Sequence, residues 1–199
     1  YVHDIAEGEL NSDKELPATV NTLRITNRAD RTTMPGVHHQ PRITKVILDS
    51  SCEKCVKVGD QFLWGMSSLT SIDLGPLRNC TSVGSFFLHQ SALRTIDLTG
   101  LSKCTEIVGG YFVSECKQLQ TVDFSPLSNL KAIPQDFLSG CTGVTSIVFA
   151  PSSNVKSVSN NFLRGCTSLS TVDLRVLSNC KSVSFNFLGR CAGLKTIDL

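Results

Sequence analysis

Short stretches in which apolar and polar residues alternate recur along most of the chain at nearly equal distances. Around Ile72 and Leu74, the polar residues Ser71 and Asp73 separate the apolar ones, which is the period of a half-buried strand. The central apolar position recurs at Val46, Ile72, Ile96, Val122, Ile147, Val172 and Ile197. The steps are 26, 24, 26, 25, 25 and 25 residues, and Leu23 takes the same place in a weaker copy 23 residues before Val46. A fixed period of this size predicts a repeat architecture.

The rest of each unit predicts how the coil closes. After the strand, apolar positions recur every three residues, as in Leu77, Cys80 and Val83, which indicates a tight and turn-rich path. Phe87 and Leu88 then bring the chain back toward the next strand. No single unit can bury this apolar face alone, so we expect stacked units. The predicted fold is a solenoid with a parallel sheet on one face and short turns, 3-10 or short strand segments on the other.

The repeated core resembles a known family. FLSGCTGVTSIVF at 137–149, FLRGCTSLSTVDL at 162–174 and FLGRCAGLKTIDL at 187–199 share the form F-x-x-C-x-x-L-x-x-I-x-L. This form is similar to the BspA-like (Treponema-type) leucine-rich repeat family, and the ID[LF]-x-x-L-S-[NK] variety resembles its protist-type copies. The resemblance covers about residues 43–199. It implies a leucine-rich-repeat solenoid that serves as an adhesive or protein-binding surface.

The chain divides into two parts by its texture. Residues 43–199 form the repeat array of about six and a half units. Residues 1–42 are polar and irregular, and we expect them to form an N-terminal cap or an irregular first coil that shields the first edge. The sequence stops within a unit at TIDL, so we expect that the array continues beyond Leu199 or that a partner covers this edge.

Composition argues for a binding protein more than for an enzyme. The chain of 199 residues is 41% hydrophobic and 18% charged, which supports a sizeable core. A net charge of +2 does not favour nucleic acid, and no apolar run approaches the roughly 18 residues of a membrane span. The motifs of phosphate loops, nucleophile elbows and zinc proteases are missing from the sequence. We therefore expect no catalytic residues, no cofactor and no small-molecule substrate.

Nine cysteines stand out at this length, and Cys52 and Cys55 have the Cys-x-x-Cys spacing of redox pairs and zinc sites. The other units replace Cys52 by leucine, and Leu130 and Val155 take the place of Cys55 elsewhere, which indicates core positions for small apolar groups. The predicted structural ladder comprises Cys55, Cys80, Cys104, Cys116, Cys141, Cys166, Cys180 and Cys191. A four-ligand metal site with His38 and His39 is conceivable, but we expect reduced, buried thiols and no metal. That favours a reducing intracellular compartment, with the cell surface as the alternative.

Two other columns recur beside the second cysteine position. A structural asparagine ladder is expected to bond neighbouring backbone groups along the stack, through Asn79, Asn129, Asn154 and Asn179. Lys131, Lys156 and Lys181 form a short basic column, which we interpret as solvated charge on the flank. His89 lies where the repeat varies, so we expect it at the surface.

The outward strand positions form the candidate partner-binding face. It comprises Lys45, Ile47, Ser71, Asp73, Thr95, Asp97, Thr121, Asp123, Ser146, Val148, Thr171, Asp173, Thr196 and Asp198. Five stacked aspartates repel one another, so hydrogen bonds from the Ser/Thr column, bound cations or a basic partner must offset that cost. Ile47 and Val148 interrupt the aspartates with apolar groups that the repeat does not require, which suggests partner contacts.

The function predicted from these features is a non-enzymatic module that binds a protein partner on its strand face, for adhesion or recognition. The alternative is a structural or scaffold subunit of a larger assembly that makes contacts through its flanks and ends. The strand face is rather uniform, and sequence variation is greater in the loops around 84–91, 108–115 and 159–164. That uniformity keeps the scaffold alternative open.

Overall fold

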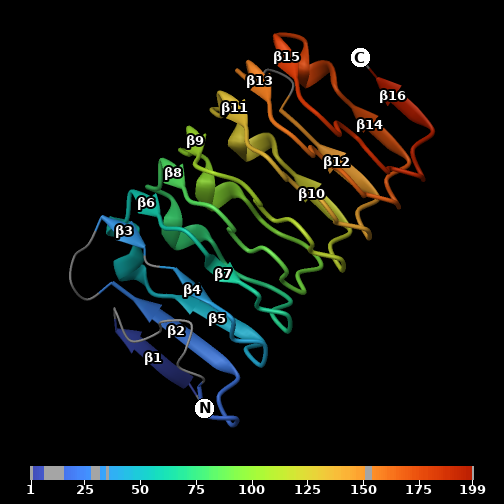
Figure 1. Ribbon diagram of the computed structural model, residues 1–199. Helices are drawn as coiled ribbons and strands as arrows, with labels where there is room; N and C mark the ends of the chain where they lie inside the picture. The colour runs from blue at the N-terminus through green and yellow to red at the C-terminus, as the bar shows by residue number, and fades with distance from the viewer. Residues whose placement is uncertain (1, 7–15, 28–31, 35, 151–153, 199) are drawn as a thin grey trace.

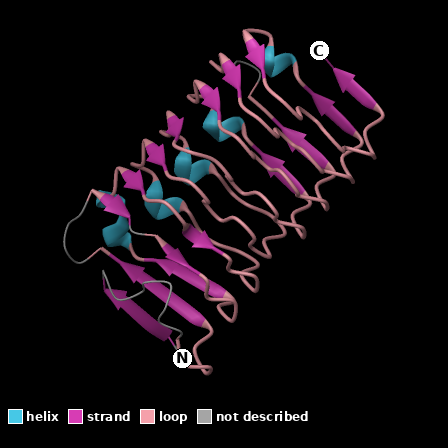
Figure 2. Cartoon of the chain, viewed as in Figure 1, coloured by secondary structure: helices cyan, strands magenta, loops and turns pink. Residues whose placement is uncertain are grey.

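The computed structural model describes residues 2–6, 16–27, 32–34, 36–150 and 154–198. The chain winds into coils that stack side by side from the N-terminus to the C-terminus (Figure 1). Most coils contribute to two separate rows of short strands, and strands and loops make up nearly all of the chain (Figure 2). The predicted leucine-rich-repeat solenoid is confirmed.

The first row of strands is the one that the alternating pattern predicts. It consists of β1 (Val2–Ala6), β2 (Thr22–Thr26), β5 (Lys45–Leu48), β10 (Thr121–Asp123), β12 (Ser146–Val148), β14 (Thr171–Asp173) and β16 (Thr196–Asp198). The pairing is parallel, and it places Leu23 opposite Val46, Val122 opposite Ile147 and Val172 opposite Ile197. We call the outward side of this row the strand face.

Two coils of this row depart from the prediction. Ile72 is joined to Val46 only by an isolated bridge, and the residues around Ile96 form no strand, although the Ile96 side chain is buried. The expectation of a strand in every unit was therefore wrong for these two. Coil length does not explain this difference, because the 23-residue step from Leu23 to Val46 keeps a continuous parallel ladder.

The second row lies on the other side of the coils, and its outward side is called the rear face below. It consists of β3 (Thr33–Met34), β6 (Lys57–Val58), β8 (Ser82–Val83), β9 (Glu106–Ile107), β11 (Ala132–Ile133), β13 (Ser157–Val158) and β15 (Ser182–Val183). Short 3-10 helices connect the two rows in five coils: η1 (Ser50–Lys54), η2 (Gly75–Leu77), η3 (Thr99–Leu101), η4 (Ser125–Leu127) and η5 (Arg175–Leu177).

The Phe-Leu segment turns the chain back toward the strand face. In each of these segments a non-glycine residue has left-handed φ, for example Leu88 at 54° and Leu138 at 54°. Successive residues of an extended strand point to opposite sides, so the left-handed residue allows the adjacent Phe87 and Leu88 both to enter the core. Such a conformation costs about 1–2 kcal/mol per residue, and the burial of two large apolar side chains per coil offsets it.

The core is a set of ladders that runs the length of the solenoid. The phenylalanines Phe62, Phe87, Phe112, Phe137 and Phe162 are buried and stack on one another. Their ring centroids lie 5.1–6.2 Å apart, close to the spacing of parallel strands. Each coil therefore covers the apolar face of the next, as the repeat pattern predicts.

The described parts of residues 1–42 extend the same architecture. β1 and β2 pair in parallel with each other and with β5, and β3 pairs with β6. β4 (Val37–His38) pairs with β7 (Phe62–Trp64), with a shift of register at Val37. These residues continue the stack of coils, and their role as a cap for its first edge stays a proposal.

Candidate functional site

The strand face presents two exposed columns, one of Ser and Thr and one of mostly Asp. The Ser/Thr column is solvent-exposed from Ser71 to Thr196. In the neighbouring column Asp73, Asp97 and Asp123 are exposed and Asp173 is half-buried. The structure therefore brings the predicted partner-binding residues together on one surface. Whether a partner uses them stays a proposal.

The aspartates are held by the backbone of their own coil. The N–H groups two residues further along donate to the Oδ1 atoms of Asp73, Asp97, Asp123 and Asp173 at 2.8–3.0 Å. In each case the donor is the first residue of the following 3-10 helix. Among the described residues, no hydrogen bond joins these carboxylates to the Ser/Thr column. The backbone amides supply the offset that we had assigned to side chains, cations or a partner.

These hydrogen bonds also set the acidity of two carboxyl groups. The backbone N–H and the hydroxyl of Thr99 hold the pKa of Asp97 below its usual value. The Arg175 guanidinium and the Arg175 backbone N–H lower the pKa of Asp173 to about 2. The Arg175 Nε lies 3.0 Å from Oδ1 of Asp173. Asp97 and Asp173 are therefore charged at neutral pH, and they form part of the stripe of aspartates on the strand face.

Val148 is the break in this stripe. Its side chain is 51% exposed, and it lies where the other coils place an aspartate. Beside it is an open hollow of about 480 Å³, lined by Ile147, Val148, Phe149, Ala150, Asp173, Arg175 and Val176. The hollow therefore has an apolar floor and the Asp173–Arg175 ion pair at its edge.

Ile47 does not form a second break of the same kind. It is half-buried, and the capping aspartate of that coil is displaced by two residues to Asp49. Asp49 accepts a hydrogen bond from the Ser51 N–H at 2.9 Å at the start of η1. The cap is thus retained in this coil with a different spacing, and Val148 remains the more exposed apolar exception.

The asparagine ladder links neighbouring coils. The side-chain amide of Asn79 donates to the Glu53 carbonyl at 2.9 Å, and that of Asn129 donates to the Ser102 carbonyl at 3.0 Å. Where lysine replaces asparagine, Lys103 Nζ donates to Asn79 Oδ1 at 2.8 Å. The asparagines of the last two coils, Asn154 and Asn179, are exposed.

The thiols form the predicted cysteine ladder in the interior. All nine cysteines are free; Cys180 and Cys191 are half-buried and the other seven are buried. Thiol hydrogen bonds run along the stack, since Cys80 donates to the Cys55 carbonyl and Cys141 to the Val113 carbonyl. Burial raises the pKa of Cys52 to about 11 and the pKa of Cys80 to about 12. Cys52 and Cys80 therefore stay protonated at neutral pH, which disfavours at these two positions the thiolate that redox chemistry requires.

The prediction that His89 lies at the surface was wrong. Its side chain is 7% exposed, and Nδ1 lies 2.6 Å from the Ser114 hydroxyl. Desolvation lowers the pKa of His89, so the imidazole is neutral at pH 7. It packs in a row of rings with Trp64, Phe86 and Tyr111, in which Phe86 and Tyr111 stack at 4.5 Å. Sequence spacing does not reveal this row, because the other coils have polar residues at these positions.

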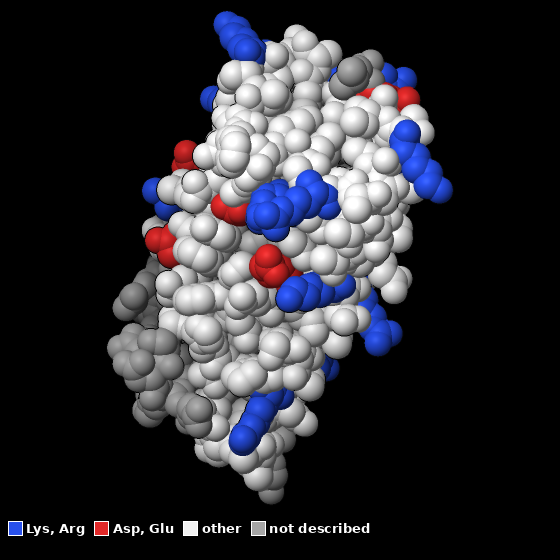
Figure 3. Space-filling view, turned by 45° about the vertical axis from the view of Figure 1, so that its right-hand side comes forward, with Lys and Arg blue, Asp and Glu red and all other residues white. Residues whose placement is uncertain are grey.

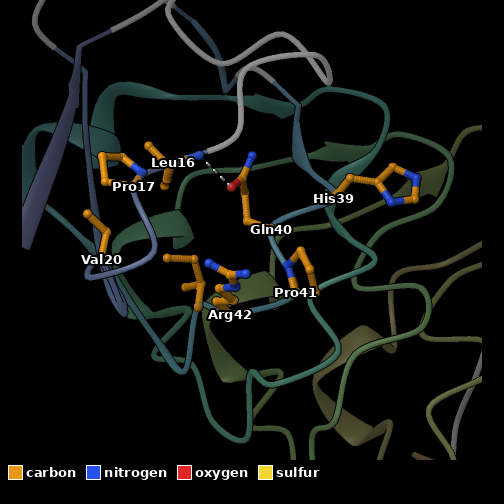
Figure 4. Close-up of a pocket in the computed structure, with 8 residues that line it drawn as sticks. Leu16, Pro17, Val20, His39, Gln40, Pro41 and Arg42 are labelled. Carbon is orange, nitrogen blue, oxygen red and sulfur yellow. Dashed lines mark hydrogen bonds between the residues drawn. The ribbon is translucent and has the colours of Figure 1, made fainter.

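A smaller hollow lies near the start of the array. It measures about 110 Å³ and is lined by Leu16, Pro17, Val20, His39, Gln40, Pro41, Arg42 and Ile43. Figure 4 shows the hydrogen bond from the Leu16 N–H to Gln40 Oε1 and shows the His39 ring pointing away from the other residues. The imidazole of His39 instead lies 4.3 Å from Trp64, centroid to centroid. This hollow gathers no set of groups with an evident chemistry.

Charged groups are scattered over the visible surface, with wide areas that carry neither sign (Figure 3). In the part of the chain that the structure describes, no group of three or more His, Cys, Asp or Glu side chains could hold a metal ion. Cys52 donates instead to the Ile25 carbonyl in the core. No helix within the described ranges has the length and apolar character to cross a membrane.

Comparisons with known proteins agree with this architecture. The sequence matches the BspA type leucine rich repeat region, in six copies over residues 38–170 and 99–199. A comparison with proteins of curated function finds no match.

Among solved structures, the chain is similar to a leucine-rich cell surface protein from Faecalibacterium prausnitzii, with 12% identity and a TM-score of 0.49. It is also similar to a leucine-rich repeat protein from Bacteroides ovatus, with 16% identity and a TM-score of 0.40. The two matches cover 89% and 92% of this chain but only 38% and 62% of those two proteins. A third is the functional domain of InlJ from Listeria monocytogenes, described as including a cysteine ladder, with 13% identity, a TM-score of 0.34 and coverage of 83% and 40%.

Proposed function

The chain belongs to the BspA type leucine-rich repeat family, and from that premise we propose that it is a non-enzymatic module that binds a protein partner on its strand face. The observation that carries this proposal is Val148, an exposed apolar side chain in the one described strand-face coil where a valine replaces a capping aspartate. Val148 pairs in β12 as its equivalents do in their strands, but its side chain cannot accept the backbone hydrogen bond that the aspartates accept. A partner that covers this side chain would gain the free energy of burying apolar surface.

The hollow beside Val148 defines the chemistry of the partner. Its apolar floor suits one apolar side chain, and the Asp173–Arg175 pair at its edge suits a polar group of the partner. The Ser/Thr column alongside offers hydroxyl groups that can donate or accept hydrogen bonds. A short segment with an apolar anchor and flanking polar residues fits this surface.

The scaffold alternative rests on the uniformity of the strand face, whose outward residues are mostly Ser, Thr and Asp. A subunit that makes contacts through its flanks and ends would leave Val148 open. The two functions therefore differ in which side chains the partner buries.

For the compartment we propose a reducing intracellular location, which free, buried cysteines suit, with the cell surface as the alternative. The half-buried Cys180 and Cys191 allow a test in intact cells. An alkylating reagent that cannot cross membranes modifies these two thiols only if the protein lies at the surface.

The binding proposal is tested by capture of the partner with the intact protein and with two variants. Val148→Asp places a charge on the apolar anchor and should weaken capture of the identified partner at least tenfold. Val108→Asp is the matched control, because Val108 is 52% exposed but lies at the rear face. Capture that both variants retain, or that both lose equally, would contradict the proposal.

A further inference from the structure

A third hollow lies on the rear face, away from the strand face. It is open to solvent, measures about 390 Å³ and is lined by Gly109, Gln135, Ser159, Asn160 and Ser184. These residues come from four successive coils, each just after its rear strand. The hollow therefore runs along the axis of the solenoid, across the direction of the strands.

The lining is polar and uncharged, and most of its side chains are not used by the fold. Among the described residues, no hydrogen bond involves the side-chain amide of Gln135 or the hydroxyl groups of Ser159 and Ser184. Asn160 Oδ1 accepts from the Phe185 N–H at 3.1 Å, which leaves the NH₂ of that amide for a ligand. Each of three neighbouring coils thus offers at least one group that can donate a hydrogen bond.

Exposed apolar side chains flank the hollow along the chain at both ends. Phe185 follows Ser184 and is 75% exposed, and Val108 precedes Gly109 and is 52% exposed. The exposure of Val108 comes from one extra residue in its coil. Four residues separate Ile107 from Phe112, whereas three separate Ile133 from Phe137. This insertion pushes the backbone outward, as a bulge does.

The coil spacing indicates how a ligand would lie. Neighbouring coils are about 4.8 Å apart, the distance between paired strands. A pyranose ring is about as long as this spacing. A chain of sugars along the axis would therefore offer one ring to each coil, with hydroxyl groups facing the amide and hydroxyl groups of the floor. The ring of Phe185 offers an apolar surface for the C–H groups of a terminal sugar.

From the hollow, its unused polar groups and its flanking apolar side chains, we propose that the rear face binds a neutral oligosaccharide of three or four pyranose units. Charge argues for a neutral ligand, because no charged side chain lines the hollow. The basic column of Lys131, Lys156 and Lys181 lies three or four residues earlier in each coil, at least about 10 Å away along the strands. An anionic chain would be drawn to those lysines instead. A proline-rich peptide requires a groove lined with aromatic rings, and this floor has none.

The test measures binding of four uncharged hexasaccharides by calorimetry: cellohexaose, maltohexaose, mannohexaose and chitohexaose. The full chain is compared with Gln135→Ala, Asn160→Ala and Phe185→Ser. Gln120→Ala is the matched control, since Gln120 is an exposed amide that does not line the hollow. We expect at least one sugar to bind the unchanged protein. Each of the three hollow variants should bind it more than tenfold more weakly, and the control should bind it unchanged. Far-UV circular dichroism of every variant shows that the fold is retained.

Three outcomes would overturn the proposal. The first is no binding of any of the four sugars at millimolar concentration. The second is binding that the Gln135 and Asn160 variants retain. The third is a preference for hexagalacturonate that Lys156→Ala abolishes, or for a proline decapeptide, because either would assign the surface to another class of ligand. None of these results bears on the protein-binding proposal, which concerns the strand face.

Discussion

Two neighbouring coils of the strand face show what the repeat requires and what it leaves free. In the coil at 121–133, Asp123 accepts a hydrogen bond from the Ser125 N–H and η4 follows directly. In the coil at 146–158, Val148 takes the place of the aspartate, and no 3-10 helix occurs in its described residues, which exclude 151–153. The inward residues are nevertheless the same in kind, since Val122 lies opposite Ile147 and both are buried.

The comparison separates two reasons for a recurring residue. Aspartate recurs because the first N–H groups of a short helix need an acceptor, and a carboxylate two residues earlier supplies one. Its column is therefore a consequence of the turn and needs no ligand. A residue that appears in one coil without serving the turn has no such explanation. Val148 is such a residue, and we therefore propose that the partner binds there.

The largest expected loss of stability comes from changes in the core, which should affect the two coils equally. Cys141 and Cys166 lie in the core below successive coils, and both are buried. Cys141→Ala and Cys166→Ala should each lower the free energy of unfolding by roughly 1–2 kcal/mol, because each removes packed atoms without removing a reaction. Urea denaturation measures this. A much smaller loss for Cys141→Ala than for Cys166→Ala would mean that the core beside the coil at 146–158 is less tightly packed.

A thiol-labelling experiment provides the control for that result. The half-buried Cys180 and Cys191 should be modified first in the native protein, and Cys80, whose pKa burial raises to about 12, should be modified only on unfolding. Rapid native labelling of Cys141 or Cys166 would contradict their place in the core.

A smaller effect should distinguish the two coils at their surface. Asp123→Ala removes the acceptor at the start of η4 and should cost about 1 kcal/mol of stability. Val148→Ala removes an exposed side chain and should change stability by less than about 0.5 kcal/mol. The two values come from the same denaturation experiment. Equal losses would break the distinction between a structural and a free position.

The smallest effect is a pH dependence that belongs to the aspartate coils alone. The folded pKa values of Asp97 and Asp173 lie below their unfolded values, with Asp173 at about 2. Their stabilisation is therefore present above about pH 4 and is lost as the pH falls toward 2. The melting temperature of Asp173→Asn should fall less than that of the unchanged protein between pH 5 and pH 2. Parallel curves would show that Asp173 contributes no pH-dependent stability.

The sequence predicted the fold well because the period records the packing. Residues such as Ile147 and Val172 occur at a fixed step since each must meet its equivalent in the next coil. The same argument placed the cysteines, because a position that also accepts Leu130 and Val155 is apolar. The strand predicted around Ile96 was wrong, because alternation places the apolar side chains inward but does not by itself set the backbone hydrogen bonds between coils.

The candidate surfaces were harder to predict. The aspartate column was visible, but its acceptor role depends on backbone N–H groups that carry no sequence signal apart from the 3-10 turn that follows. The burial of His89 depends on Ser114, which lies 25 residues further along the chain. The rear hollow is flanked by Val108, which lies beside one inserted residue, and by Phe185, and both lie at positions where the repeat varies. Such sites arise from departures between coils, which a search for the repeat averages away.

Hydrogen–deuterium exchange of the protein with its captured partner tests whether the partner binds at Val148. We expect the partner to slow exchange at residues 145–150 and 173–176, around Val148 and Arg175, and to leave the capped turns at 73–75 and 97–99 unchanged. Slower exchange spread evenly along the aspartate column, or confined to the final coil and the flanks, would contradict the claim that the break in the column is the binding site.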